Sequence, residues 1–302
     1  MSDDTPPRTG LEGRIFLVGV PRSGTTLLQS LVAAHSRVTS FTESHLFSRP
    51  FRQVPGLGPV LAEDPTPRLR EFLDENQASV ADVAPWFGPP APPELASKIG
   101  LASHTRSVAR RLVGVLDALA RQRGMAVWLE KTPRHLHALP LLEAICDDGI
   151  PTRFVHLFRD GLQTVASLHA ASRQWPEAYD LDTCIDRWNR DLVRSARFIG
   201  RAGHHFVRYE TLTRSPEAVL RALFAALELS WEAEVLAGFG DAAAELHTPD
   251  EAWKAGLARP IEPSATAGEV LDAAQRKRAQ VRLNPTAYGQ LTKVALGEPP
   301  RG

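Results

Sequence analysis

Short apolar runs alternate along the chain with longer segments in which apolar residues recur every three or four positions. The short runs are rich in Val, Ile and Phe, and they predict strands at residues 14–20, 126–129, 152–158 and 205–208. The longer segments predict helices at residues 25–35, 101–123, 136–146, 162–171, 181–199 and 216–227. Strands that alternate with helices are typical of a parallel sheet with crossover helices, so we predict an α/β fold.

One proline-rich region interrupts the alternation. Ten of the 24 prolines lie within residues 49–100, which we expect to form a loop-rich insertion around short helices such as residues 68–80. A long irregular insertion in a compact domain is often a binding loop or lid. Since no repeat or clear linker divides the chain, we expect one domain over residues 1–302 that ends in a helical segment at 266–302.

The composition indicates a soluble globular protein with a substantial core. Apolar residues make up 43% of the chain, and 35 basic residues balance 35 acidic ones, which argues against a nucleic-acid partner. Two cysteines, Cys146 and Cys184, are too few for a disulfide framework. The N-terminal sequence MSDDTPPRTG is unlike a signal peptide, and no apolar run approaches the roughly 20 residues that span a bilayer. We therefore expect a cytoplasmic protein that does not bind a membrane.

The first predicted strand runs into the sequence GVPRSGTT, which outlines a phosphate-binding loop. Gly19 ends the strand, Gly24 shapes the turn, and Thr25 and Thr26 begin a helix whose N–H groups and dipole face one anion. A triphosphate loop has a lysine where Thr25 stands. With Arg22 as its strong cation, the loop suits one phosphate better than three. The alternative is an ordinary strand-to-helix turn.

A second strand-to-helix signal occurs in FVHLFRDGLQTVASLH. Ser167 follows Arg159 by eight residues, across a turn and into the next helix. Because parallel strands end at one edge of their sheet, this arginine and hydroxyl are expected near a second phosphate of the same ligand. The alternative is a solvated turn and helix face.

The ordered pair PRSGTTLL and RDGLQTVASL resembles the sulfotransferase family that uses 3′-phosphoadenosine 5′-phosphosulfate (PAPS), over about residues 14–229. The resemblance implies a three-layer α/β/α fold of the P-loop nucleotide hydrolase type, with PAPS as co-substrate, 3′-phosphoadenosine 5′-phosphate (PAP) as product and no metal. It assigns the 5′-phosphosulfate to Arg22, Ser23, Gly24, Thr25 and Thr26. It assigns the 3′-phosphate to Arg159 and Ser167, and the adenine to Tyr209.

The resemblance also identifies cations for the leaving phosphate. Lys131, in WLEKTPRH at the end of a predicted strand, is similar to the catalytic lysine of the family, and Arg22 is the second cation. Cytosolic members place a histidine base two residues after this lysine, where Pro133 stands here.

A different residue must therefore act as the base. Glu43 follows the phosphate loop at the spacing of the catalytic glutamate in tyrosylprotein sulfotransferases, which is also preceded by a PRSGTT-type loop. A carboxylate there accepts a proton from the acceptor hydroxyl if burial raises its pKa. His45 and Glu130 are reserve candidates.

The acceptor and the nucleotide cap stay open. Aromatic residues of the insertion favour a hydrophobic or aromatic alcohol, a phenol or a peptide tyrosine, whether on a small molecule or a peptide. These residues are Phe51, Phe72, Trp86 and Phe87. The R-K-G-x-x-G loop of cytosolic members is absent, and its candidate substitutes are Lys254, Arg259 and Ser264.

Other histidines and aromatics receive structural predictions. We expect His135, His137, His204 and His205 to be structural. We expect Trp175, Tyr179 and Trp188 to be core or acceptor-pocket residues. A homodimer is left open. Two further functions are compatible with the loop: a non-catalytic protein that binds PAP or PAPS, and an ATP-dependent kinase, which Thr25 disfavours.

Overall fold

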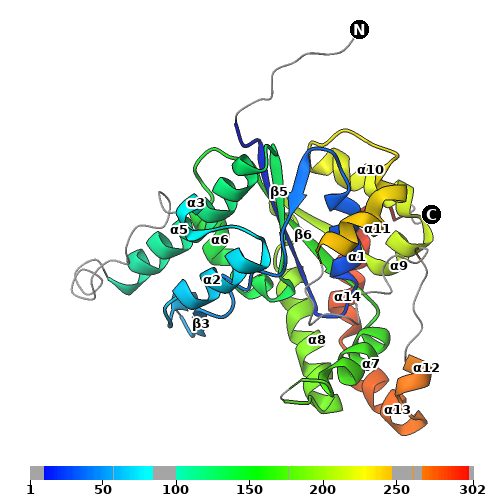
Figure 1. Ribbon diagram of the computed structural model, residues 1–302. Coiled ribbons are helices and arrows are strands. Elements are labelled where there is room, and N and C mark those ends of the chain that lie inside the picture. The colour runs from blue at the N-terminus through cyan, green and yellow to red at the C-terminus, as the bar shows by residue number, and fades with distance from the viewer. Residues whose placement is uncertain are drawn as a thin grey trace.

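Five parallel strands form a central sheet in the order β2-β5-β1-β6-β7 (Figure 1). The computed structural model describes residues 10–56, 58–83, 100–175, 177–246, 261 and 267–298. The strands are β1 (Gly13–Gly19), β2 (Val38–Ser40), β5 (Val127–Lys131), β6 (Thr152–Phe158) and β7 (His204–Arg208). The chain crosses from β1 to β2 and β5 on one side and continues to β6 and β7 on the other. The end of β1 is therefore the point where the strand order reverses, and such a point is the usual ligand site of an open α/β sheet.

Each face of the sheet has its own hydrophobic core. Ile15 and Leu17 of β1 enter one core, whereas Phe16 and Val18 enter the other, because side chains alternate along a strand. The first face is covered by α1 (Thr25–Ala33), α9 (Tyr209–Arg214), α10 (Pro216–Ala226) and α11 (Val235–Glu245). The second is covered by α5 (Leu101–Gln122), α6 (Leu139–Ile145), α7 (Gly161–Ser172) and α8 (Leu181–Ala196). This arrangement confirms the predicted α/β fold with a parallel sheet between helices.

The proline-rich insertion contains more regular structure than we predicted. Its elements are the antiparallel hairpin β3 (Phe51–Val54) and β4 (Gly58–Leu61) and the helices α2 (Thr66–Glu75) and α3 (Val80–Val83). The prediction of a loop-rich segment missed this hairpin, and the helix expected at 68–80 ends at Glu75. Phe51 and Phe72 are buried in the core. Trp86 and Phe87 lie outside the described residues.

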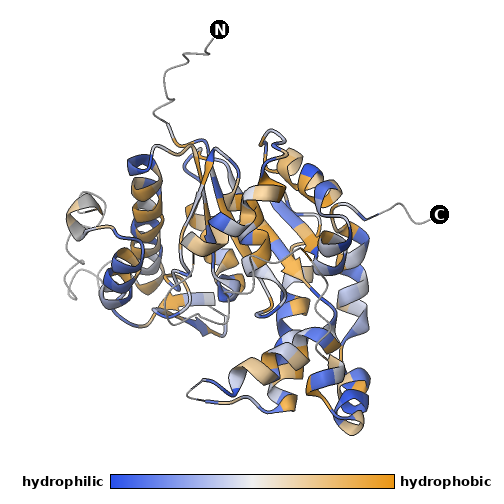
Figure 2. Cartoon of the chain, turned by 45° about the vertical axis from the view of Figure 1, so that its right-hand side comes forward, coloured by the Kyte–Doolittle hydropathy of each residue, from blue (hydrophilic) through white to orange (hydrophobic). Residues whose placement is uncertain are grey.

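The predictions missed β2, α9 and α11, and the remaining elements differ from them mainly at their ends. The helix expected at 136–146 is a 3₁₀ helix, Pro133–His137, followed by α6. The C-terminal segment forms α12 (Ala267–Val270), α13 (Ala273–Arg282) and α14 (Pro285–Val294). Figure 2 shows hydrophobic residues concentrated on the sheet and on the inner sides of the helices. Among the described residues, no helix has the length and apolar character needed to cross a membrane.

Candidate active site

The carboxyl edge of the sheet brings the predicted site residues together. Each of the five strands contributes a residue or loop at its carboxyl end, in the spatial order of the strands. From β2 to β7 these are Glu43, Lys131, the loop 20–24, Arg159 and Tyr209. Residues far apart in the sequence therefore become neighbours, because parallel strands all end at the same edge.

The phosphate loop between β1 and α1 depends on two glycines. A Cβ at Gly19 would overlap the carbonyl oxygen of Leu157, and a Cβ at Gly24 would overlap the ring of Tyr209. Gly24 also has a φ of 97°, in the left-handed region that favours glycine. Because Gly24 is the N-cap of α1, the first N–H groups of the helix have no intrahelical acceptor and point out of its N-terminus.

Ser23 has a more structural place in this loop than the resemblance implies. Its side chain is fully buried. Its hydroxyl donates to the carbonyl oxygen of Val20 over 2.6 Å, and its backbone N–H reaches the same oxygen at 3.2 Å. Both donors thus close the turn. Its part in binding the 5′-phosphosulfate stays a prediction.

Arg22 extends from the loop toward α7. It adopts a φ of 71°, which is uncommon for a residue other than glycine, and its Nε donates to Ser167 Oγ over 3.3 Å. Burial and the neighbouring positive charge of Arg159 lower the pKa of Arg22, while Glu43 opposes the shift. Two guanidinium groups that disfavour each other's charge create a local potential that attracts an anion.

Arg159 is held by its surroundings at the end of β6. Its side chain is almost entirely buried, and its guanidinium carbon lies 4.5 Å from the centroid of the Tyr209 ring. Trp188 donates from Nε1 to the Arg159 carbonyl oxygen over 3.2 Å. The next residue, Asp160, caps α7 by accepting the Gln163 N–H. The ring of Tyr209 contacts the loop and this guanidinium, and its contact with adenine stays a prediction.

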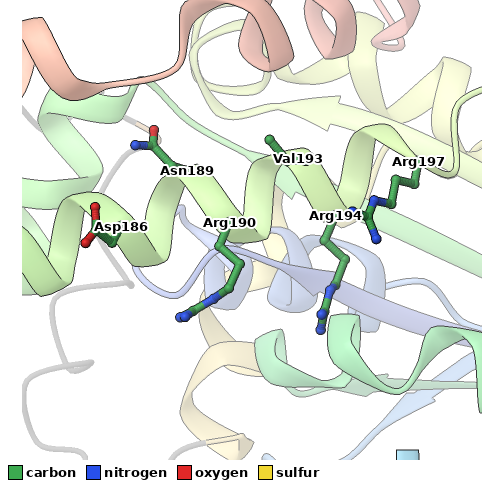
Figure 3. Close-up of a pocket in the computed structure, with 6 residues that line it drawn as sticks. All are labelled: Asp186, Asn189, Arg190, Val193, Arg194 and Arg197. Carbon is green, nitrogen blue, oxygen red and sulfur yellow. The ribbon is translucent and has the colours of Figure 1, made fainter. Parts of the chain in front are cut away.

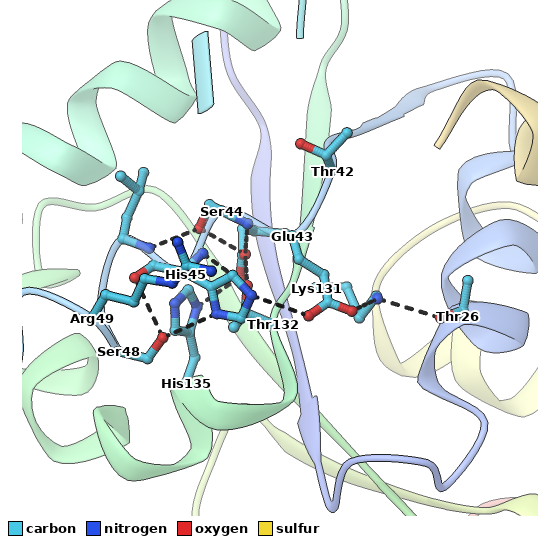
Figure 4. A network of polar contacts seen from close by, with 12 residues as sticks. Thr26, Thr42, Glu43, Ser44, His45, Ser48, Arg49, Lys131, Thr132 and His135 are labelled. Atoms are coloured by element: carbon cyan, nitrogen blue, oxygen red, sulfur yellow. Dashed lines mark hydrogen bonds and ion pairs between the residues drawn. The ribbon is translucent and has the colours of Figure 1, made fainter. Parts of the chain in front are cut away.

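Lys131 and Glu43 form an ion pair beside the loop (Figure 4). Lys131 is the last residue of β5, which ends two residues later than predicted, and its side chain is 1% exposed. The Glu43 side chain is 24% exposed. Lys131 Nζ also lies 3.4 Å from Thr26 Oγ1 at the start of α1. The lysine therefore joins the predicted base to the phosphate loop.

A comparison of the sequence with protein families shows which family the chain belongs to. The sequence model described as the sulfotransferase family matches residues 14–233, which is most of the chain. The chain belongs to the sulfotransferase family. The match contains the predicted loop, Arg159, Ser167, Tyr209, Lys131 and Glu43, whereas the candidate nucleotide caps lie beyond it.

Individual members of the sulfotransferase family resemble the chain at low identity. It is 25% identical over 229 residues to protein-tyrosine sulfotransferase 2 of Gallus gallus, covering 74% of this chain and 53% of that protein. It is 23% identical over 244 residues to protein-tyrosine sulfotransferase A of Caenorhabditis elegans, covering 78% of this chain and 54% of that protein. The chain thus spans about half the length of these curated relatives.

Among solved sulfotransferases, the mouse enzyme SULT7A1 is similar to this chain in fold. Mouse sulfotransferase SULT7A1 complexed with PAP shares 11% identity at a TM-score of 0.51, over 92% of this chain and 88% of that one. The similarity shows that the two chains have the same fold of helices around a central parallel sheet.

The two reserve bases have different surroundings in this sulfotransferase-family site. His45 Nε2 lies 3.6 Å from Glu43 Oε2, and burial lowers the pKa of His45 to about 4. Glu130 is fully buried on the opposite face of β5 from Lys131. Although burial raises the pKa of Glu130, His135 and hydrogen bonds from Thr132 and Ser44 lower it overall. Glu130 is thus an ionised and enclosed carboxylate, whereas Glu43 is partly open to solvent.

Sequence reasoning missed the groups that surround Glu43. Thr132 Oγ1 accepts the His45 N–H, and Arg68 donates to the Glu43 carbonyl oxygen. Ser44, Thr132 and His135 lie close to Glu43 and His45 (Figure 4). The motif WLEKTPRH contains two of these residues, but its pattern does not indicate which side chains face the segment after β2. Arg68 lies in the insertion, where no motif marks it.

Other predicted residues lie away from this edge. Trp188 is a core residue, and His204 is buried beside His156, as we expected of structural residues. A cavity of about 360 Å³ lies along one face of α8, and none of the predicted site residues lines it (Figure 3). Its lining residues are Asp186, Asn189, Arg190, Val193, Arg194 and Arg197. The candidate nucleotide caps Lys254, Arg259 and Ser264 fall outside the described residues.

Proposed function

We propose that this protein is a sulfotransferase that transfers a sulfuryl group from PAPS to a hydroxyl acceptor. One observation carries the proposal: the Glu43–Lys131 ion pair lies directly beside the phosphate loop, with Lys131 Nζ 3.4 Å from Thr26 Oγ1. A base, a buried cation and an anion-binding helix N-terminus are the groups that in-line transfer from a phosphosulfate requires. The protein-tyrosine sulfotransferases and the PAP-bound mouse enzyme among its relatives support the same reading.

In the proposed reaction the acceptor oxygen attacks sulfur as the bond from sulfur to the bridging oxygen breaks. Glu43 takes the proton of the acceptor hydroxyl, so that the new sulfate ester forms without a net positive charge on its oxygen. Negative charge grows on the bridging oxygen, where Lys131 and Arg22 stabilise it. For this, Lys131 must turn from Glu43 toward the donor, and the Glu43 carboxylate then accepts the proton.

The nucleotide half of PAPS is assigned to the other side of the loop. We propose that backbone N–H groups at Gly24, Thr25 and Thr26 bind the 5′-phosphosulfate, and that Arg159 and Ser167 bind the 3′-phosphate. The buried guanidinium of Arg159 suits this role, since a charge-assisted hydrogen bond is stronger when water is excluded. The acceptor is proposed to be an alcohol, a phenol or a peptide tyrosine.

The test uses sulfur-labelled PAPS with a panel of phenols, alcohols, glycans and tyrosine peptides. We expect labelled product with at least one hydroxyl class. Glu43→Gln should keep its affinity for PAP and lower kcat by about 10²–10⁴-fold, the usual contribution of a general base. Glu63→Gln, an exposed glutamate of the insertion, is the matched control and should leave kcat unchanged.

Two outcomes would overturn the proposal. Tight PAP binding without labelled product for any acceptor would indicate a non-catalytic nucleotide-binding protein. Phosphoryl transfer that requires ATP and Mg²⁺ would indicate a kinase.

A further inference from the structure

The buried carboxylate of Glu130 forms hydrogen bonds with the residue next to Glu43. Its Oε1 accepts hydrogen bonds from the Ser44 N–H at 3.2 Å, from the Ser44 hydroxyl at 2.8 Å and from the Thr132 hydroxyl at 2.6 Å. Thr132 Oγ1 in turn accepts the His45 N–H over 3.2 Å. Glu130 thus fixes the two peptide N–H groups that follow Glu43, that of Ser44 directly and that of His45 through Thr132. Ser44, His45 and Thr132 are labelled in Figure 4.

The second oxygen of Glu130 has one defined donor. His135 Nδ1 lies 2.8 Å from Glu130 Oε2, and His135 Nε2 lies 3.1 Å from the backbone N of Phe47. A backbone N–H can only donate, so Nε2 is the acceptor and the ring hydrogen is on Nδ1. Glu130 therefore accepts four hydrogen bonds, which requires its ionised form.

Arg68 binds the same stretch of chain through the backbone carbonyl groups of Glu43 and Ser44. Its Nη2 donates to the Glu43 carbonyl oxygen over 2.8 Å, and its Nε donates to the Ser44 carbonyl oxygen over 2.7 Å. The side chain is 9% exposed and is anchored by Glu71 and Glu75, at 2.9 and 3.0 Å. The insertion thus contributes α2 and this arginine to the site.

We propose that Glu130 and Arg68 are positioning residues that fix the backbone of residues 43–45, so that the Glu43 carboxylate meets Lys131 at the sheet edge. The inference rests on the proposed role of Glu43 as the base. The Glu130 carboxylate binds the N–H groups of Ser44 and, through Thr132, of His45, and the Arg68 guanidinium binds the C=O groups of Glu43 and Ser44. Both the N–H and the C=O group of each of these two peptides are therefore hydrogen-bonded, while the Glu43 side chain stays partly exposed.

The energetics favour a positioning role over a purely stabilising one. Burying a charge costs several kcal/mol, and a well-packed apolar residue often stabilises a core equally well. His45, inside the held segment, has a φ of 52° in the left-handed region, which a free chain rarely adopts. Strained backbone that is held by surrounding hydrogen bonds is common at functional sites.

Glu130→Gln tests the inference with little change of shape. The amide oxygen can still accept from Ser44 and Thr132, but its NH₂ then faces the Nδ1–H of His135. If the His135 hydrogen moves to Nε2, it faces the Phe47 N–H instead. In either case two hydrogen-bond donors face each other without an acceptor, so the backbone of residues 43–45 must shift. We expect kcat to fall by about 10–100-fold, the effect of misplacing a reacting group by about 1 Å, with PAP affinity unchanged.

Asp117→Asn is the matched control. Asp117 is a carboxylate with 4% exposure that accepts hydrogen bonds from Arg14 and Trp128. Within the described part of the chain, none of its hydrogen bonds reaches residues 43–45. Its substitution removes a comparable buried hydrogen-bonding group. We expect a loss of stability similar to that of Glu130→Gln, with kcat unchanged.

Amide hydrogen exchange provides a readout that needs no activity. In the wild type the Ser44 and His45 amides should be protected, and both Glu130→Gln and Arg68→Met should expose them more than Asp117→Asn does. Wild-type kcat together with wild-type exchange in Glu130→Gln would overturn the inference. A kcat that falls by the same factor in Glu130→Gln and in Asp117→Asn would do the same. Absence of transfer by the wild type would overturn the proposed function, and the exchange data would still decide whether the two residues hold the segment.

Discussion

Replacing Lys131 by methionine removes the cation that we propose for the leaving oxygen and keeps an unbranched side chain that is one atom shorter. The Lys131 side chain is 1% exposed, so its charge acts where water is largely excluded. Loss of one preorganised group that stabilises developing charge usually lowers kcat by about 10²–10³-fold, or about 3–4 kcal/mol of activation free energy. We expect an effect of this size.

The same substitution removes the positive charge of Lys131 from its ion pair with Glu43. Breaking a fully buried ion pair costs about 3–5 kcal/mol, because the remaining charge is stranded. The Glu43 side chain is 24% exposed, so water can solvate the carboxylate once the lysine is gone. The free energy of unfolding should therefore fall by less than that range, and the variant should fold.

The assay is kcat for sulfuryl transfer at saturating PAPS, with PAP affinity measured by calorimetry and folding checked by thermal unfolding. Lys293→Met, at an exposed lysine of α14, is the matched control and should leave kcat and PAP affinity unchanged. A Lys131→Met variant that is folded, binds PAP and turns over at nearly the wild-type rate would refute the role of this lysine.

Three further predictions follow from the geometry. Gly24→Ala should weaken PAP binding in calorimetry by about tenfold or more, because the left-handed φ costs about 1–2 kcal/mol and the new Cβ overlaps Tyr209; unchanged affinity would contradict the loop assignment. Arg159→Ala should weaken PAP by about 10–100-fold but AMP, which lacks the 3′-phosphate, far less, and equal losses for both would exclude a 3′-phosphate contact. Burial lowers the pKa of His204 to about 4, below its unfolded value, so this group contributes stability that is complete above about pH 6.5 and is lost as the pH falls toward 4. Urea unfolding as a function of pH should show this loss in the wild type but not in His204→Phe.

The local pattern of the sequence was sufficient to predict the strands and the loop that form the proposed donor site. The run at 152–158 is a strand over those same residues, because a strand buried on both faces has apolar residues at successive positions, as in Phe154-Val155 and Leu157-Phe158. The loop after β1 was also readable, since Gly24 supplies a backbone conformation that a side chain would hinder. The same local motifs were sufficient to predict that the chain is a member of the sulfotransferase family.

Tertiary structure alone decided which residues meet. Glu43 and Lys131 are 88 positions apart, and they pair because β2 lies beside β5 in the sheet, an order that no periodicity specifies. The roles of Glu130 and Arg68 depend on which backbone groups face them, which is set by packing of the insertion against the sheet. The period of apolar residues indicates which side chains are buried, but it contains no information on hydrogen bonds between distant segments. The contacts that position Glu43 could therefore be identified only from the folded chain.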